Sequence, residues 1–449
     1  MSEPRFTYSL DDLKQMSEEV LRLAKSNGAT AAEAEVSLGS GQNVSVRMGE
    51  TENIEYNRDK GMSVTVYFGQ RRGHASTSDL ASNALKDTVA AACNIARYTA
   101  EDPFCGLAEP SLMAKEIPDL DLHHAWNLTV EEALELAKEC EMAARNVDSR
   151  INNSEGASVS AYDGMFAYAN THGFNEGYAS SRHSISCAVI AEDEESMQRD
   201  YWYSNARSPD DLQSAESIGR IAGERTVRRL GGRRLKTVQV PVLFEAPLAS
   251  GLISNLVSAI SGGNLYRKSS FLLDTLGTQV MSPLVNIREE PHLKRGLASA
   301  PFDNEGVTTM QRDLIKDGVL QGYMLSSYSA RKLGMQTTGN AGGNHNLIVE
   351  PCGTGDLDFN GLLKTMGTGL LVTELLGHGL NMVTGDYSRG AAGFWVENGV
   401  IAYPVEEITI AGNLRDMFQQ IVAIGNDVLA QGSKQTGSIL IERMTVAGE

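Results

Sequence analysis

The 449-residue sequence lacks a long apolar segment, since no uncharged run approaches the roughly 18–20 residues that a membrane-spanning helix needs. Its start, MSEPRFTYSLDDLKQ, is polar and acidic and has no apolar core like that of a secretory signal peptide. We therefore expect a cytoplasmic protein that does not associate with membranes.

Cysteine is scarce as well. The five cysteines lie far apart and form no C-x-x-C pair, so the sequence indicates neither a disulfide framework nor a cysteine-rich zinc site. Basic residues are outnumbered, because 39 Lys and Arg against 57 Asp and Glu give a formal net charge of -18. Such a charge repels phosphate, so we expect no direct binding of nucleic acid. The one basic island, Arg225–Lys236, is interpreted as the cationic end of a helix.

Common nucleotide-binding and nucleophile motifs are also missing. The sequence has no Walker A loop, no G-x-S-x-G and no G-x-G-x-x-G after a predicted strand. An S-x-x-K match occurs at Ser329–Lys332, but the K-T-G and S-D-N motifs that accompany it in β-lactamases are absent. We therefore interpret the glycine-rich segments as turns.

Two or three domains are expected from the length. A pattern of helix, strand meander and helix occurs twice, over residues 1–115 and 116–236, and capping boxes at Ser9 and Thr129 begin the two copies. Residues 100–126 contain three prolines and are predicted to be a linker. Both copies are predicted to be α+β lobes.

From residue 237 onward glycines are frequent, and strand runs meet at turns such as Asp317-Gly318 and Asn398-Gly399. Helices are predicted only at about 247–261 and 413–430. We therefore expect residues 237–449 to form a β-rich, mainly antiparallel domain. The predicted fold class is α+β, with two amino-terminal helix-meander-helix lobes followed by this domain.

The segment TELLGH (residues 373–378) resembles a zinc-peptidase helix, since histidine at Thr373 would give H-E-x-x-x-H. Flanking glycines and the β-branched Val372 and Thr373 indicate a strand instead. In a strand Glu374 and His378 would lie about 13 Å apart, too far to share an ion. His345, in the glycine-rich TGNAGGNHN, either lines a pocket or belongs to a turn.

Several long stretches resemble the TldD/PmbA family. They are GETENIEYNRDKGMSVTVYFGQRRGHASTSDL (49–80), RKSSFLLDTLG (267–277), GLASAPFDNEGV (296–307), RDLIKDGVLQGYMLSSYSARKLG (312–334) and VTGDYSRGAAGFWVENG (383–399). The likeness runs over nearly the whole chain and is closest to the PmbA branch, also called TldE. The family also carries the label modulator of DNA gyrase.

The resemblance implies a two-protein cytosolic peptidase that degrades unfolded or leader peptides. In this family TldD carries zinc on an H-E-x-x-x-H helix with a late cysteine as a further ligand, and TldE completes the chamber. The three helix positions fall here on Ser254, Asn255 and Ala259, and the late position falls near Thr436. The resemblance thus implies no catalytic residue, metal ligand or cofactor in this chain, with zinc in a TldD-like partner.

Four residues in the matching stretches are candidates for peptide contact, together with His345: Arg267, Lys268, Tyr387 and Arg389. They either line the peptide chamber or belong to turns and interface packing. Three functions stay open. The first is the zinc-less subunit, and the second is a metallopeptidase in its own right, a homo-oligomer that uses Glu374, His378 and His345. The third is a binding or regulatory protein without a role in proteolysis. Self-dimerisation without the partner also stays open.

Overall fold

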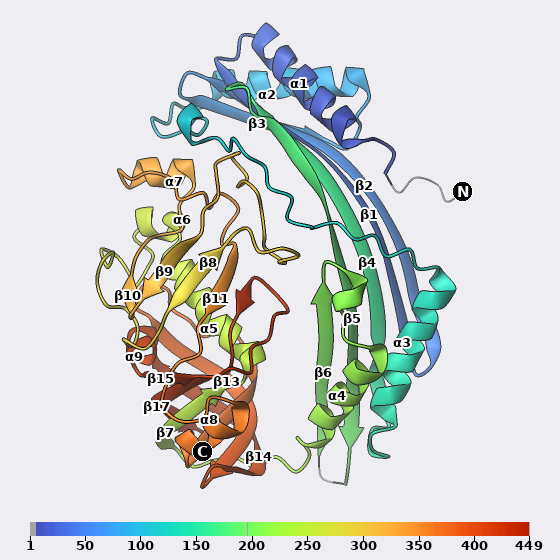
Figure 1. The fold of residues 1–449 in the computed structure, drawn as a ribbon, viewed down its shortest axis with the longest axis vertical. Helices are drawn as coiled ribbons and strands as arrows, with labels where there is room; N and C mark the ends of the chain where they lie inside the picture. The colour runs from blue at the N-terminus through green and yellow to red at the C-terminus, as the bar shows by residue number, and fades with distance from the viewer. Residues whose placement is uncertain (1–5, 195, 449) are drawn as a thin grey trace.

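The computed structural model describes residues 6–194 and 196–448 (Figure 1). Its amino-terminal half contains one six-stranded antiparallel sheet with the order β3-β2-β1-β4-β5-β6. The strands are β1 (Ala31–Arg47), β2 (Glu50–Phe68), β3 (Arg71–Thr77), β4 (Asn153–Asn170), β5 (Asn175–Glu192) and β6 (Met197–Ala206). The repeat of helix, meander and helix is confirmed, and its two halves share this sheet through the antiparallel pairing of β1 with β4.

Four helices cover one face of the sheet: α1 (Leu10–Ser26), α2 (Ser82–Tyr98), α3 (Val130–Arg145) and α4 (Ala215–Val227). In Figure 1, α1 and α2 lie near one end of the curved sheet, and α3 and α4 lie near the other. Both predicted capping boxes are present, at Ser9 and at Thr129. Side chains of β1 alternate, with Ala32, Ala34 and Val36 buried under the helices.

The other face of the sheet is concave and turned toward the carboxy-terminal half (Figure 1). Small polar residues such as Ser160 of β4 and Ser184 of β5 lie on it at the alternate positions. The Tyr162 ring lies against glycines of β1, since a methyl group at Gly39 would be 2.5 Å from the Tyr162 hydroxyl oxygen. The part of this face around Ser160 and Ser184 is therefore polar. Farther along the same face, Phe166 and Tyr178 pack against Phe302 of the carboxy-terminal half.

The carboxy-terminal half contains two sheets, with the orders β10-β9-β8-β11-β16 and β14-β13-β12-β7-β17-β15. An additional pairing of β14 with β17 joins the second sheet into a ring. Their strands are β7 (Val238–Phe244), β8 (Ile287–Glu290), β9 (Arg312–Lys316), β10 (Val319–Leu320), β11 (Asn346–Val349), β12 (Gly369–Leu376), β13 (Asp386–Glu397), β14 (Val400–Asn413), β15 (Ile421–Ile424), β16 (Lys434–Gln435) and β17 (Ile439–Ala447). The predicted β-rich, mainly antiparallel architecture is confirmed, and parallel pairing occurs between β7 and β12 and between β11 and β16.

Helix α5 (Ala246–Ala259) shares its core with residues of both of these sheets through Leu252, Ile253 and Leu256. Four shorter helices are α6 (Gly262–Tyr266), α7 (Ser327–Lys332), α8 (Phe359–Met366) and α9 (Leu414–Gln419). The helix predicted over 413–430 is therefore wrong beyond Gln419. The chain enters β15 there, because Ile421 and Ile424 gain a ladder and burial against β17.

Residues 100–126 are irregular as predicted, apart from a short 3-10 turn at Pro110–Leu112. They are packed rather than free, since Met113 and Ala114 are buried in a cluster with Phe174 and Phe302. The segment therefore connects the large sheet to the carboxy-terminal half. Among the residues described, no helix combines the length and apolar character needed to cross a bilayer.

Helices α3 and α4 meet at two glycines. A methyl group at Gly219 would be 1.9 Å from the Cys140 carbonyl oxygen, and one at Gly223 would be 2.5 Å from the Ala144 carbonyl oxygen. Because both obstacles are backbone atoms, no rotamer change can relieve them. This close approach positions α4, and with it the end of the sheet that carries β6.

We expect Gly219→Ala to lower the free energy of unfolding by about 2 kcal/mol, because overpacking outweighs the gain in helix propensity. Gly251→Ala in α5 is the matched control, since its methyl group would meet no atom within 4 Å. We expect the control to be neutral or stabilising by about 0.5–1 kcal/mol. Chemical denaturation of both variants measures the difference, and equal stability of the two would contradict the close helix contact.

Candidate functional site

The site is built around α5, whose first turn contains Pro247 after the N-cap Glu245. Ser254, Asn255 and Ala259 are the positions that the family resemblance marks. The Ser254 hydroxyl donates to the Ser250 carbonyl oxygen at 2.9 Å, and Ala259 is fully buried. Ser254 is thus half-buried, whereas Ala259 lies in the apolar core.

A cavity of about 190 Å³ lies beside α5. Its lining comes from three parts of the chain: Tyr203 on β6; Ala246, Pro247, Ser250 and Ser254 on α5; and Leu429, Gln431, Gly432, Ser433 and Lys434 on the segment that leads into β16. Burial lowers the pKa of the half-buried Lys434. Thr436 is itself buried, with 1% of its surface exposed, and its hydroxyl donates to the Gly437 carbonyl oxygen.

A second cavity, of about 410 Å³, lies on the concave face of the large sheet. Ser160, Tyr162, Arg182, Ser184, Ser186, Tyr203 and Asn205 line it. Tyr203 lines both cavities, so they adjoin where β6 approaches α5. Sequence patterns did not identify this arrangement; the available signal was Lys434, two residues before the late motif position at Thr436.

The TELLGH segment belongs to β12 and to the turn that follows it, so the strand prediction is confirmed. Glu374 forms an ion pair with Arg229, whose side chain is only 9% exposed. His378 is exposed beyond the end of β12. The structure therefore gives Glu374 a cationic partner and does not place it in a cluster with His378 and His345.

Arg229 belongs to a buried ion-pair network that also contains Arg225 and Arg228. Arg225 donates to both carboxylate oxygens of Glu245 at 3.0 Å and lies 3.4 Å from Asp200. Arg228 donates to Glu245 at 3.3 Å, and Arg229 lies 3.6 Å from Asp200. The basic island at the end of α4 thus binds carboxylates of β6, of the residue that caps α5 and of β12.

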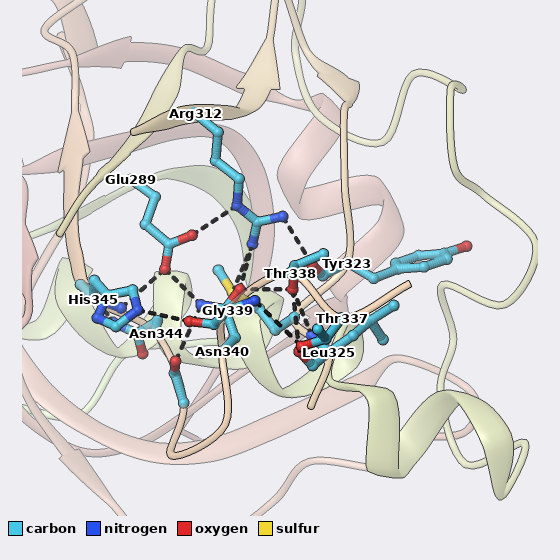
Figure 2. Close-up of polar contacts among 12 residues, drawn as sticks. Glu289, Arg312, Tyr323, Leu325, Thr337, Thr338, Gly339, Asn340, Asn344 and His345 are labelled. Carbon is cyan, nitrogen blue, oxygen red and sulfur yellow. Dashed lines mark hydrogen bonds and ion pairs between the residues drawn. The ribbon is translucent and has the colours of Figure 1, made fainter. Parts of the chain in front are cut away.

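His345 lies inside a hydrogen-bonded loop, which Figure 2 shows together with its partners. Its backbone N–H donates to the buried Glu289 carboxylate at 2.9 Å, and its ring Nε2 contacts the Gly339 carbonyl oxygen at 2.9 Å. Arg312 donates to the same Glu289 at 2.8 Å and to the Asn340 side-chain oxygen at 2.9 Å. The loop is therefore held by a buried ion pair, and the cavity beside α5 is lined by other residues.

The other four candidates are dispersed. Arg267 and Lys268 are exposed at the end of α6, where the Arg267 guanidinium lies over the Tyr266 ring. Tyr387 of β13 is buried, which raises its pKa to about 12 although Arg389 opposes the shift. The structure does not bring these residues together with His345 into one cavity among those described above.

Comparison with known families defines the class of protein. Three consecutive family models of the PmbA/TldA metallopeptidases match: domain 1 over residues 32–96, the central domain over 123–230 and the C-terminal domain over 237–448. The chain therefore belongs to the PmbA/TldD family of metallopeptidases.

Individual relatives agree over almost the full length. The chain is 51% identical to a metalloprotease PmbA of Escherichia coli O157:H7, over 96% of this chain and 94% of that protein. It is 49% identical to a PmbA homolog of Haemophilus influenzae, over 97% and 96% of the two chains. A Bacteroides thetaiotaomicron crystal structure that carries the name modulator of DNA gyrase superposes with a TM-score of 0.92 at 30% identity, covering 98% of this chain and 99% of that one.

We expect Glu374→Gln to lower the free energy of unfolding by about 1–3 kcal/mol, because it removes one of the two carboxylates that pair with the poorly exposed Arg229 and leaves only Asp200 at 3.6 Å. Glu407→Gln is the matched control, since Glu407 pairs with Arg234 at the surface and we expect an effect within about 0.5 kcal/mol. Denaturant titration measures both variants. Loss of bound zinc on Glu374→Gln would instead make TELLGH a metal site.

Asp303 holds the glycine-rich loop by accepting the Ala341 N–H at 3.0 Å. Burial, reinforced by the nearby Glu305, raises the pKa of Asp303 to about 7 although backbone N–H groups lower it. An unfolded aspartate has a pKa of about 3.9. Between these two pKa values the folded protein keeps the Asp303 proton and the unfolded chain has lost it. The contribution of Asp303 to the free energy of unfolding therefore falls as pH rises from about 4 to 7.

We expect Asp303→Asn to remove this contribution, so that its stability falls less steeply than that of the unmodified protein between about pH 4 and 7. Asp148→Asn is a control of opposite sign, because its interactions with Arg150 lower the pKa of Asp148 to about 2. That contribution is present above about pH 4 and is lost as pH falls toward 2. Equal pH profiles for Asp303→Asn and the unmodified protein would contradict the assignment.

Proposed function

We propose that this chain is the zinc-less subunit of a two-chain, zinc-dependent cytoplasmic peptidase acting on unfolded or leader peptides. The observation that carries the proposal is the chemistry of α5. The resemblance assigns two zinc ligands and a general base to three positions of this helix. In this chain those positions are Ser254, Asn255 and Ala259. Zinc in proteins takes imidazole, thiolate or carboxylate ligands. A hydroxyl, an amide and a methyl group do not fit that ion, so we derive no catalytic step through it here.

The remaining fold supports a role as part of a chamber. The chain aligns with 94% of the length of a metalloprotease PmbA relative. The concave sheet face, which is polar around Ser160 and Ser184, is turned toward the carboxy-terminal half (Figure 1). Such a face offers hydrogen bonds to an extended peptide without a large apolar surface that would retain the product. A TldD-like chain would contribute the zinc and the base, and this chain would contribute walls and peptide contacts.

The two alternatives have less support. A metallopeptidase that acts alone would need Glu374, His378 and His345 together, but Glu374 is paired with Arg229 and His345 is buried in its own loop. Within residues 6–194 and 196–448, no group of three or more His, Cys, Asp or Glu is arranged to hold a metal. A non-proteolytic binding role has no separate observation in its favour.

We expect well below one zinc per chain when this protein is purified alone without a metal-binding tag and measured by elemental mass spectrometry. We further expect a stable complex with a zinc-loaded TldD-like chain, and cleavage of unstructured peptides by the complex that a chelator abolishes. The TldD-like chain alone is the control. One zinc per chain that disappears on Glu374→Gln or His378→Ala, or failure of the two chains to associate, would overturn the proposal.

A further inference from the structure

The two adjoining cavities have an unusual charge for this chain. Acidic residues outnumber basic ones by 57 to 39 in the sequence. In the part of the chain that the structure describes, however, the lining of both cavities contains the cations Lys434 and Arg182 and no acidic side chain. The rest of the lining is uncharged and includes six serines and two tyrosines. The surface is therefore suited to an anionic ligand rather than to a cation.

Lys434 is the central group. Its ammonium donates to the Ser433 hydroxyl at 3.2 Å, which uses one of its three N–H bonds. Among the described residues no carboxylate lies within ion-pair distance of it. Its half-burial makes the charge costly without a counter-ion and lowers its pKa. A negatively charged ligand in the cavity would remove this cost.

The size and polarity of the cavity narrow the class of ligand. About 190 Å³ is smaller than the roughly 300–1,000 Å³ of sites that enclose drug-sized molecules. The cavity can therefore take a terminal group rather than a whole folded or cyclic ligand. Tyr203 connects it to the larger cavity on the sheet, where Arg182 donates to the Asn205 side chain at 3.1 Å. A chain that leaves the small cavity can continue along the polar sheet face.

We propose that the small cavity beside α5 binds a carboxylate of an extended peptide, with Lys434 as the counter-ion. The rest of the peptide lies on the concave face of β5 and β6. The proposal rests on the proposed function, since it specifies how the zinc-less subunit holds its substrate. The carboxylate is either the carboxy-terminal one or an Asp or Glu side chain. Lys434 is thus a substrate-positioning residue of a subunit without metal ligands on α5.

The test is peptide binding to the full-length chain alone, measured by fluorescence anisotropy at low salt with a neutral amino-terminal dye. Three unstructured peptides of the same length are compared: a free-acid peptide without Asp or Glu, its carboxy-amidated form, and an amidated form with one internal Glu. We expect the free acid to bind about tenfold more tightly than the amidated peptide, as one charged hydrogen bond implies. Tight binding of the internal-Glu peptide would show that a side-chain carboxylate is sufficient for binding at the site.

Lys434→Met should abolish the difference between these peptides, and Lys434→Arg should retain most of it. Lys364→Met is the matched control, because Lys364 is exposed on α8 and away from both cavities. The melting temperature of each variant shows that it is folded. Equal binding of all three peptides, no binding of any, or an undiminished difference in Lys434→Met would overturn the site.

The outcome is separable from that of the proposed function. Binding that depends on both the carboxylate and Lys434 supports the site even if no TldD-like chain associates, in which case the peptidase role fails. Conversely, suppose that a zinc-dependent complex cleaves peptides while the isolated chain binds all three peptides equally. That result overturns the site and leaves the proposed function standing.

Discussion

The relative placement of the two halves of the molecule depends on the buried ion pairs that Arg225 and Arg229 form with Asp200, Glu245 and Glu374. Both arginine side chains are 9% exposed, and a guanidinium that is removed from water is tolerated only when carboxylates surround it. Asp200 lies on β6, Glu245 precedes α5, and Glu374 lies on β12. The ion pairs of Arg225 and Arg229 therefore hold β6 against α5. Because β6 and α5 are held together, the two cavities that they line adjoin at Tyr203.

The shared sheet has a second consequence for the site. Because β1 and β4 pair along nearly their whole length, the two amino-terminal repeats form one continuous curved surface. The helices cover its convex face (Figure 1). Polar side chains of β4, β5 and β6 therefore remain available on the concave face. The α3–α4 contact at Gly219 positions α4, and the arginines at its end therefore lie within reach of their carboxylate partners. Fold and site are thus connected through a few close backbone and charge contacts.

Local signals in the sequence predicted local structure well. The capping boxes at Ser9 and Thr129 and the Asn398-Gly399 turn depend on neighbouring residues, and each is present in the structure. The helix predicted to 430 failed because strand pairing of Ile421 with β17 is a tertiary interaction that helical periodicity cannot reveal. The basic island does lie at the end of α4, as predicted. Its ion-pair partners could not be predicted, since Asp200 and Glu374 lie 25 and 145 residues away from the arginines they contact.

The candidate site could not be predicted from the sequence, because none of its residues belongs to a recognisable sequence motif. A serine on a helix, a lysine in a loop and a tyrosine on a strand carry no motif, and they become a site only when α5, β16 and β6 converge. That convergence needs no ion at α5, since the helix packs through the buried apolar side chains of Leu252 and Leu256. The ammonium of Lys434, which faces the hydroxyl groups of this cavity without a paired carboxylate, is therefore the group that a peptide carboxylate would complement under the proposal.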